Sequence, residues 1–264
     1  MVSRIITASV LLVFILPALF WAPAEIWASL AALAIAIAGI EWGRIAGFPA
    51  PVPVVYGVLL AACAAVLYFQ ANHKELIHGL LWLAVAFWAL VVPIWLAQHW
   101  KIRSPFVLAM VGAIVLLPTW VALVRLRDLG PWHLLGLLAI VWIADSAAYF
   151  SGRKFGSRKL APSISPGKTW EGVAGATVAL VVYACVASAF IAGVHIVGAL
   201  LLAMSLLYFS ILGDLFESWM KRVAGIKDSG TILPGHGGIL DRIDALTAAL
   251  PIGVAILLIA GGHL

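Results

Sequence analysis

Long apolar runs recur along this sequence, and they constrain its fold more than any other feature. A helix that spans the hydrocarbon core of a bilayer needs about 20 consecutive apolar residues. An open strand could not satisfy its backbone polar groups in lipid, so each run is predicted to be helical. The fold class is therefore all-α, a polytopic integral membrane protein of about nine transmembrane helices. The predicted spans are 5–22, 26–43, 52–70, 76–97, 105–124, 132–150, 170–191, 194–213 and 244–262.

The composition supports this fold class. Hydrophobic residues make up 64% of the 264 residues and charged residues only 10%, whereas soluble domains carry roughly 25% charged residues. The first run follows a single Arg, as in a signal peptide, but it is long for a signal core, so we predict an uncleaved first helix. Tryptophans near predicted span ends are typical of an interfacial aromatic belt. These are Trp21, Trp27, Trp42, Trp95, Trp100 and Trp132.

Two features of the composition exclude other classes of function. Cys63 and Cys185 both lie in apolar runs and form no CxxC pair, so they predict neither a disulfide framework nor a zinc site. The net charge of +5 is carried by no basic soluble module, and Lys/Arg bias in cytoplasmic loops explains it without nucleic acid. We therefore expect no nucleic-acid partner.

The lysines and arginines divide unequally between the two sides that nine spans would create. With the N-terminus inside, 13 of the 16 fall on the inner side and only Lys74, Arg125 and Arg127 on the outer side. Cytoplasmic loops carry an excess of these residues. The N-terminus and both long charged loops, 151–169 and 214–240, are therefore predicted to face the cytoplasm.

The charged side chains concentrate in the second half of the chain. Seven of the 11 acidic residues and nine of the 16 Lys/Arg lie between Asp145 and Asp244. Lipid solvates no charge, so such a set is kept where water, an ion or a charged substrate meets it. A plain solvated loop is the alternative. We divide the chain into an N-terminal set of about five membrane helices, 1–130, and a C-terminal catalytic membrane region, 131–264.

Carboxylates occur in spaced sets at two predicted helix ends. Glu217 and Ser218 follow Asp214 at i+3 and i+4, and Asp244 follows Asp241 at i+3, so each set shares one helical face. A helix-dipole cap would explain Asp241 but not Asp244 one turn deeper. Carboxylates beside many cations suit a Mg²⁺ ion that bridges to substrate phosphates. A second cation could share the cluster.

A glycine-rich turn lies between these two sets. Three glycines in the four residues 235–238 let backbone N–H groups approach an anion. The turn leads into a predicted helix N-terminus, which is a ready anion site. His236 in this turn could be a general base or a phosphate donor, and a backbone role for the turn fits equally well.

The other loop has its own candidates. Asp145 lies in or at the end of a predicted span, where a carboxylate is costly. Ser165-Pro166 predicts an N-cap and first residue of the next helix, with Lys168 and Thr169 in a first turn suited to phosphate. Gly-Lys-Thr does not complete a P-loop, because position 162 is Pro where Gly is required. Four further cations fit anionic lipid head groups as well as they fit substrate. They are Arg153, Lys154, Arg158 and Lys159.

One spaced set of residues connects these features: Ser218-x-x-Lys221-Arg222, Lys227-Asp228 and Pro234-x-His236-Gly237-Gly238-x-x-Asp241-Arg242-x-Asp244. This unbroken set resembles the signature of the bacterial phosphatidate cytidylyltransferases, also called CDP-diacylglycerol synthases. The resemblance implies transfer of CMP from CTP to phosphatidate, which gives CDP-diacylglycerol and pyrophosphate. It also implies Mg²⁺ dependence, a homodimer, and a role in phospholipid synthesis at the bacterial inner membrane.

The expected site residues follow from the motif and the two loops. The expected metal ligands are Asp214, Asp241 and Asp244. The other expected catalytic residues are Lys221, Arg222, Lys227, Asp228, His236 and Arg242. The expected substrate-binding residues are Asp145, Ser165, Lys168, Thr169, Ser218, Gly237 and Gly238.

Two other classes of function remain as alternatives. An anion transporter would also place charge in the membrane, but the charges gather at one face and no inverted repeat is visible. Another lipid-head-group enzyme is the second alternative. The sequence motif of the CDP-alcohol phosphotransferases is absent, and a nucleotide screen would identify a polyisoprenol kinase.

Overall fold

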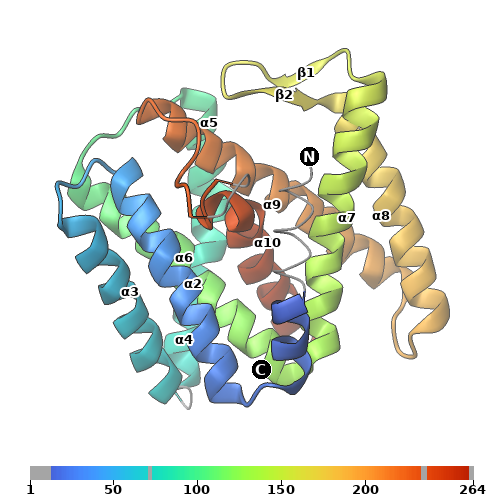
Figure 1. Ribbon diagram of the computed structural model, residues 1–264. Helices are drawn as coiled ribbons and strands as arrows, with labels where there is room; N and C mark the ends of the chain where they lie inside the picture. The colour runs from blue at the N-terminus through green and yellow to red at the C-terminus, as the bar shows by residue number, and fades with distance from the viewer. Residues whose placement is uncertain (1–12, 71–72, 233–236, 262–264) are drawn as a thin grey trace.

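The computed structural model describes residues 13–70, 73–232 and 237–261, and helices make up nearly all of it (Figure 1). Eight helices in this part of the chain are long and apolar enough to cross a membrane, which confirms the all-α, polytopic fold class. Residues 13–22 of the first expected span are described, and 13–21 of them are helical. The helices are α2 (Ala24–Ile45), α3 (Val52–Phe69), α4 (Lys74–Ala86), the π-helix η1 (Phe87–Val91), α5 (Val92–Gln98), α6 (Pro105–Leu129), α7 (Pro131–Phe155), α8 (Trp170–Phe190), α9 (Ile196–Val223) and α10 (Leu240–Ile259).

Three helices extend further into the charged segments than the sequence predicts. Helix α7 ends at Phe155, α9 continues to Val223, and α10 begins at Leu240. The charged connections are therefore 156–169 and 224–239 rather than 151–169 and 214–240. The predicted span ends followed the loss of hydrophobicity, but charged residues continue a helix when partners on it or beside it satisfy them.

A two-stranded hairpin joins α7 to α8 (Figure 1). Strand β1 (Lys159–Ala161) pairs antiparallel with β2 (Ser165–Thr169). The helix start predicted at Ser165-Pro166 is therefore wrong. A residue that precedes proline prefers an extended backbone, and the N-cap is instead Thr169, whose Oγ1 accepts a hydrogen bond of 3.1 Å from the Gly172 N–H.

Tryptophan hydrogen bonds tie α2 to α6. Trp42 Nε1 donates to the Leu108 carbonyl at 2.7 Å, Trp27 Nε1 to Leu123 at 3.1 Å, and Trp120 Nε1 to Ala28 at 3.0 Å. A polar group buried among membrane helices must find its partner inside the protein. Of the tryptophans expected in an interfacial belt, Trp27, Trp42 and Trp95 are buried instead, while Trp21, Trp100 and Trp132 are exposed.

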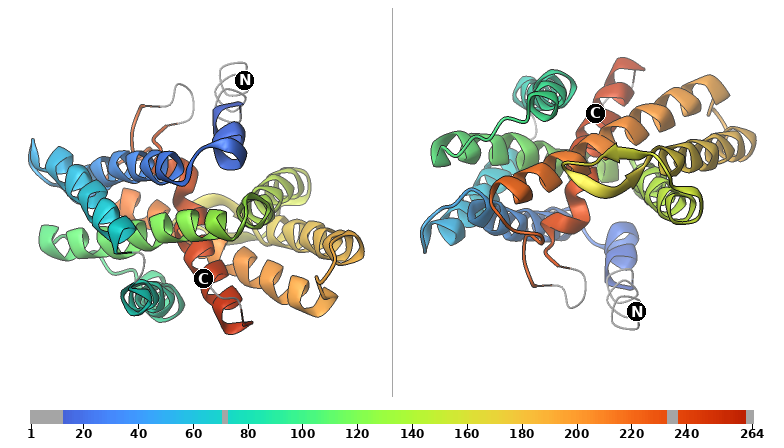
Figure 2. Two further views of the ribbon diagram at one scale, coloured as in Figure 1. Left: turned by 90° about the horizontal axis from the view of Figure 1, so that it is seen from below. Right: turned by 90° about the horizontal axis from the view of Figure 1, so that it is seen from above.

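Helix α10 lies inside the assembly and contacts both halves of the chain. Figure 2 shows α7 and α8 on one side, α2 and α3 on the other, and α10 between them, with α9 running across from α8. Helix α10 packs against α9, α6, α4, α7 and α2, and its residues from Ala245 to Ala255 are buried. Gly213 of α9 permits the closest approach, because a Cβ there would lie 2.5 Å from the Asp244 carbonyl oxygen.

We expect Gly213→Ala to destabilise the protein by about 1–3 kcal/mol, because an added methyl group in a packed contact forces two backbones apart. The matched control is Gly198→Ala on the same helix, where a Cβ meets no atom within 4 Å. Thermal unfolding in detergent should show a lower midpoint for Gly213→Ala and an unchanged or higher midpoint for the control. Equal midpoints for the two variants would contradict this packing.

Candidate active site

Lys221 is the centre of a buried ionic cluster between α9 and α10. Its Nζ lies 2.6 Å from Asp241 Oδ1 and 3.2 Å from Glu217 Oε2, and the residue is 9% exposed. Glu217 is one helical turn before it on α9, and Asp241 is in the first turn of α10. A buried charge is strongly destabilising without a partner, so this cation holds two acidic helix segments together.

The Asp241 carboxylate also closes the loop that precedes α10. Asp241 Oδ2 accepts hydrogen bonds from the backbone N–H of Ser229 at 2.9 Å and of Gly238 at 2.8 Å. Gly237 has a φ of +81°, and a Cβ there would lie 2.6 Å from Asp241 Oδ2. In the structure, Gly237 makes room for this carboxylate and Gly238 donates to it, where the sequence analysis expected both to bind substrate.

Asp214 connects α9 to the hairpin. Its Oδ2 lies 2.7 Å from Lys168 Nζ, and the two side chains are 31% and 24% exposed. Its Oδ1 accepts a hydrogen bond of 3.2 Å from Ser218 Oγ, so the predicted i,i+4 pair forms. Lys168 is on β2, and the hairpin therefore brings a cation from a distant part of the chain to α9.

Two carboxylates have few donors. Glu217 is 3% exposed, and neither of its carboxylate oxygens accepts a hydrogen bond of good geometry from the described residues. Asp244 Oδ1 accepts the N–H of the next residue, Ala245, at 2.8 Å. Asp244 also lies within electrostatic reach of Asp214, and its carboxyl group interacts with that of Glu217. Three acidic side chains therefore lie close together in this part of the cluster.

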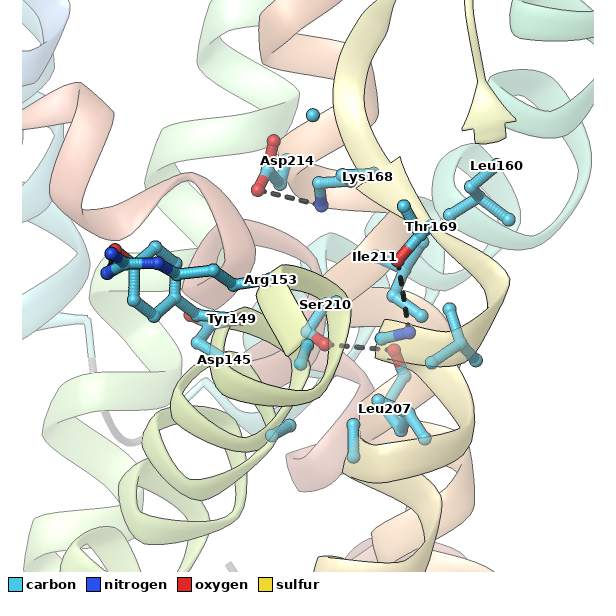
Figure 3. Close-up of a pocket in the computed structure, with 17 residues that line it drawn as sticks. Asp145, Tyr149, Arg153, Leu160, Lys168, Thr169, Leu207, Ser210, Ile211 and Asp214 are labelled. Carbon is cyan, nitrogen blue, oxygen red and sulfur yellow. Dashed lines mark hydrogen bonds and ion pairs between the residues drawn. The ribbon is translucent and has the colours of Figure 1, made fainter. Parts of the chain in front are cut away.

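A cavity of about 360 Å³ opens beside Lys168 and Asp214, between α7, α8, α9 and β2. In Figure 3 the Lys168 and Asp214 side chains point toward each other at the wall of the cavity. Asp145, Tyr149 and Arg153 belong to the part of the wall that α7 provides. The remaining wall is largely apolar and includes Ala144, Ala148, Val173, Ala176, Leu207 and Ile211. The cavity thus has a polar part and a hydrocarbon-lined part.

The structure brings most of the predicted residues together in two adjacent places. Asp214, Ser218, Lys221, Asp241 and Asp244 belong to the α9–α10 cluster, and the cavity wall adds Asp145, Lys168 and Thr169. No three Asp, Glu, His or Cys side chains of the described residues form a ready metal-binding group.

Other predicted residues lie outside these two places. Ser165 pairs with Ala161 within the hairpin, and His236 lies outside the described residues. Three predicted residues, Arg222, Lys227 and Asp228, are exposed at the end of α9 or on the loop before α10. Arg242, in the first turn of α10, is also exposed, but it lies within electrostatic reach of Asp145 at the cavity.

The structure also adds residues that the sequence analysis did not assign to the site. Glu41 of α2 accepts hydrogen bonds from the first N–H groups at the start of α10. Its position inside a predicted span was the available signal, since a carboxylate in a membrane segment is a functional candidate by default. Ser210 and Tyr149 line the cavity, and no spacing or motif marked them. Glu171 fixes the loop after α7 by accepting from the Ser157 and Arg158 N–H groups, each at 3.1 Å.

Comparison with known proteins identifies the family of the chain. The cytidylyltransferase family matches residues 2–260. A phosphatidate cytidylyltransferase of Pseudomonas aeruginosa is 42% identical over 98% of this chain and 97% of its own length. Those of Haemophilus influenzae and Thermotoga maritima are 38% and 31% identical and cover 94% and 98% of this chain, and 96% and 97% of their own lengths. The chain belongs to the cytidylyltransferase family and is a nucleotidyltransferase.

Proposed function

We propose that this enzyme transfers CMP from CTP to phosphatidate at the cytosolic face of the bacterial inner membrane, giving CDP-diacylglycerol and pyrophosphate. The observation that carries the proposal is the Lys168–Asp214 pair, which lies at the polar part of a cavity whose other walls are apolar. The phosphatidate cytidylyltransferases that resemble the chain over nearly its full length support the same reaction.

The two substrates differ in polarity, and the site suits both. The apolar wall residues on α8 and α9, such as Val173 and Leu207, would contact acyl chains, and Lys168 and Arg153 would contact the lipid phosphate. The triphosphate of CTP is a soluble polyanion. The exposed cations Arg222, Lys227 and Arg242 near the α9–α10 cluster would attract it from solution.

The donors of the α9–α10 cluster fit a Mg²⁺ ion. Asp214 and Asp244 would hold it, with phosphate oxygens of the substrate as further ligands, which is the usual mode for this ion. Glu217 places a third carboxyl group beside Asp244. Asp241 is satisfied by Lys221, Ser229 and Gly238, so it would become a ligand only by releasing one of them. When bound, Mg²⁺ would neutralise phosphate charge, and a second cation could do the same.

The chain's own residues position the reactants. A phosphatidate phosphate oxygen forms a bond to the α-phosphorus of CTP, and the bond to pyrophosphate breaks. Lys168 would orient the attacking phosphate, and Lys221 would stabilise charge at the α9–α10 cluster. Nucleotidyl and phosphoryl transfers depend mainly on such positioning and charge neutralisation. No strong general base is required, because a phosphate monoester is already ionised near neutral pH.

The orientation and assembly of the enzyme are part of the proposal. The excess of Lys and Arg on the side that carries both charged loops supports a cytosolic site. A homodimer is expected from the family. The family match argues against an anion transporter and against the other lipid-head-group enzymes.

The reaction can be tested by measuring pyrophosphate release from CTP by the purified protein in detergent. Release should require both phosphatidate and Mg²⁺ and should stop on addition of EDTA, because phosphate charge would then be uncompensated. Other nucleoside triphosphates serve as controls. Release of orthophosphate instead, or solute uptake into proteoliposomes without CTP consumption, would contradict the proposal.

Lys168→Met should lower kcat/KM by roughly 10²-fold, the usual cost of removing one charge-stabilising donor. The matched control is Lys159→Met on the partner strand of the same hairpin, which is exposed and is not one of the residues that line this cavity. The control should keep near wild-type activity. Equal losses in the two variants would mean that the hairpin acts through its general positive charge and not through the pair with Asp214.

A further inference from the structure

We propose that Glu41, on α2 in the N-terminal half of the chain, is a positioning residue that fixes the start of α10 and with it Asp241 and Asp244. The inference rests on the proposed function, since it assigns to Glu41 the alignment of the same catalytic cluster. Its basis is the set of contacts that the Glu41 side chain makes.

The Glu41 carboxylate caps α10 from another helix. Oε2 accepts from the Leu240 N–H at 2.7 Å, and Oε1 accepts from the Ile239 N–H at 3.1 Å. The N-cap position of α10 is Ile239, which has no side-chain group to cap the helix. The first N–H groups of a helix lack intrahelical partners, and negative charge is stabilising there. Glu41, which is fully buried, supplies both the acceptor and the charge.

The loop before α10 is shaped around this carboxylate. A Cβ on Gly230 would lie 2.4 Å from Glu41 Oε1, and a Cβ on Gly238 would lie 2.5 Å from Oε2. Ser229 joins two acidic side chains, because its Oγ donates to Glu41 at 3.1 Å while its N–H donates to Asp241 at 2.9 Å. Ser229 therefore links the position of Asp241 to that of Glu41.

The helix that carries Glu41 is itself held firmly at this point. The next residue, Trp42, is 1% exposed, donates to the Leu108 carbonyl of α6 and stacks on Phe216 of α9 at a centroid distance of 6.3 Å. Phe216 directly precedes Glu217 of the ionic cluster. The Glu41-Trp42 pair thus contacts both helices whose relative placement brings the carboxylates together.

Glu41→Gln tests the proposal, because the amide keeps the shape but turns an N–H donor toward the N–H groups of the loop. We expect kcat to fall by about 10²-fold, the cost of a displacement of about 1 Å at a reacting centre. KM for CTP and for phosphatidate should stay within about twofold, because uniform binding is not removed. Glu25→Gln, on the exposed opposite end of α2, is the matched control and should be unchanged. A kcat for Glu41→Gln within about twofold of wild type would overturn the proposal.

Hydrogen exchange separates a positioning role of Glu41 from a general effect of the substitution on folding. The Ile239 and Leu240 amides should exchange faster in Glu41→Gln, whether or not the wild-type protein releases pyrophosphate, and unchanged exchange would overturn the proposal. Failure of the wild-type assay alone would instead count against the proposed function.

Gly230→Ala provides a second variant that does not remove Glu41. The three atoms nearest to its Cβ all belong to the Glu41 side chain, so it should lower kcat in the wild-type background and add no further loss to Glu41→Ala. Gly79→Ala, where a Cβ meets no atom within 4 Å, is its control. Additive losses in the Glu41→Ala and Gly230→Ala double variant would show that the two residues act independently, and would overturn the proposal.

Discussion

The buried ion pairs of Lys221 are the interaction on which the rest of the structure depends. Lys221 bridges Glu217 on its own helix and Asp241 on α10, at a depth where unpaired charge is too costly to keep. The pairing forces the end of α9 and the start of α10 together, and Gly213 permits it because it carries no Cβ. Asp241 also accepts hydrogen bonds from the Ser229 and Gly238 N–H groups, which close the loop that precedes α10.

The carboxylates of the cluster therefore differ in the partners that they bind. Asp241 accepts hydrogen bonds from Lys221, Ser229 and Gly238, and these contacts stabilise the loop before α10 even before any substrate binds. Glu217 pairs with Lys221, while Asp244 accepts the Ala245 N–H and lies close to both Glu217 and Asp214. Asp214 lies between the two places, since its partner Lys168 comes from the hairpin at the cavity. Asp214 therefore connects the cluster to the cavity.

The sequence was sufficient to predict the helices that span the bilayer. Apolar runs predicted the eight spans that the structure describes in full because only a helix satisfies its backbone in a bilayer. The motif from Ser218 to Asp244 identified the family and most of the ionic cluster. Hydropathy misplaced the ends of α7 and α9 and the start of α10, because charged residues continue a helix where they are paired, as Lys221 and Asp241 are, or exposed, as Arg153 and Lys154 are.

The contacts between distant segments could not be read from local patterns. Ser165 to Thr169 looked like a helix start, although the preference of the pre-proline residue for extended backbone prevailed and a hairpin formed. Gly237 and Gly238 looked like an anion loop, yet the anions they accommodate are Asp241 and Glu41 of the protein itself. Glu41 is nearly 200 residues from the helix it caps, and no periodicity can reveal such a pair.

The most direct test of the account is an experimental structure of the enzyme with CTP and Mg²⁺ bound. The account predicts the triphosphate between Lys168 and the α9–α10 cluster, with Mg²⁺ against Asp214 and Asp244 and with Glu41 still bound to the start of α10. A nucleotide bound away from these residues, or Asp214 and Asp244 both remote from the phosphates, would contradict it.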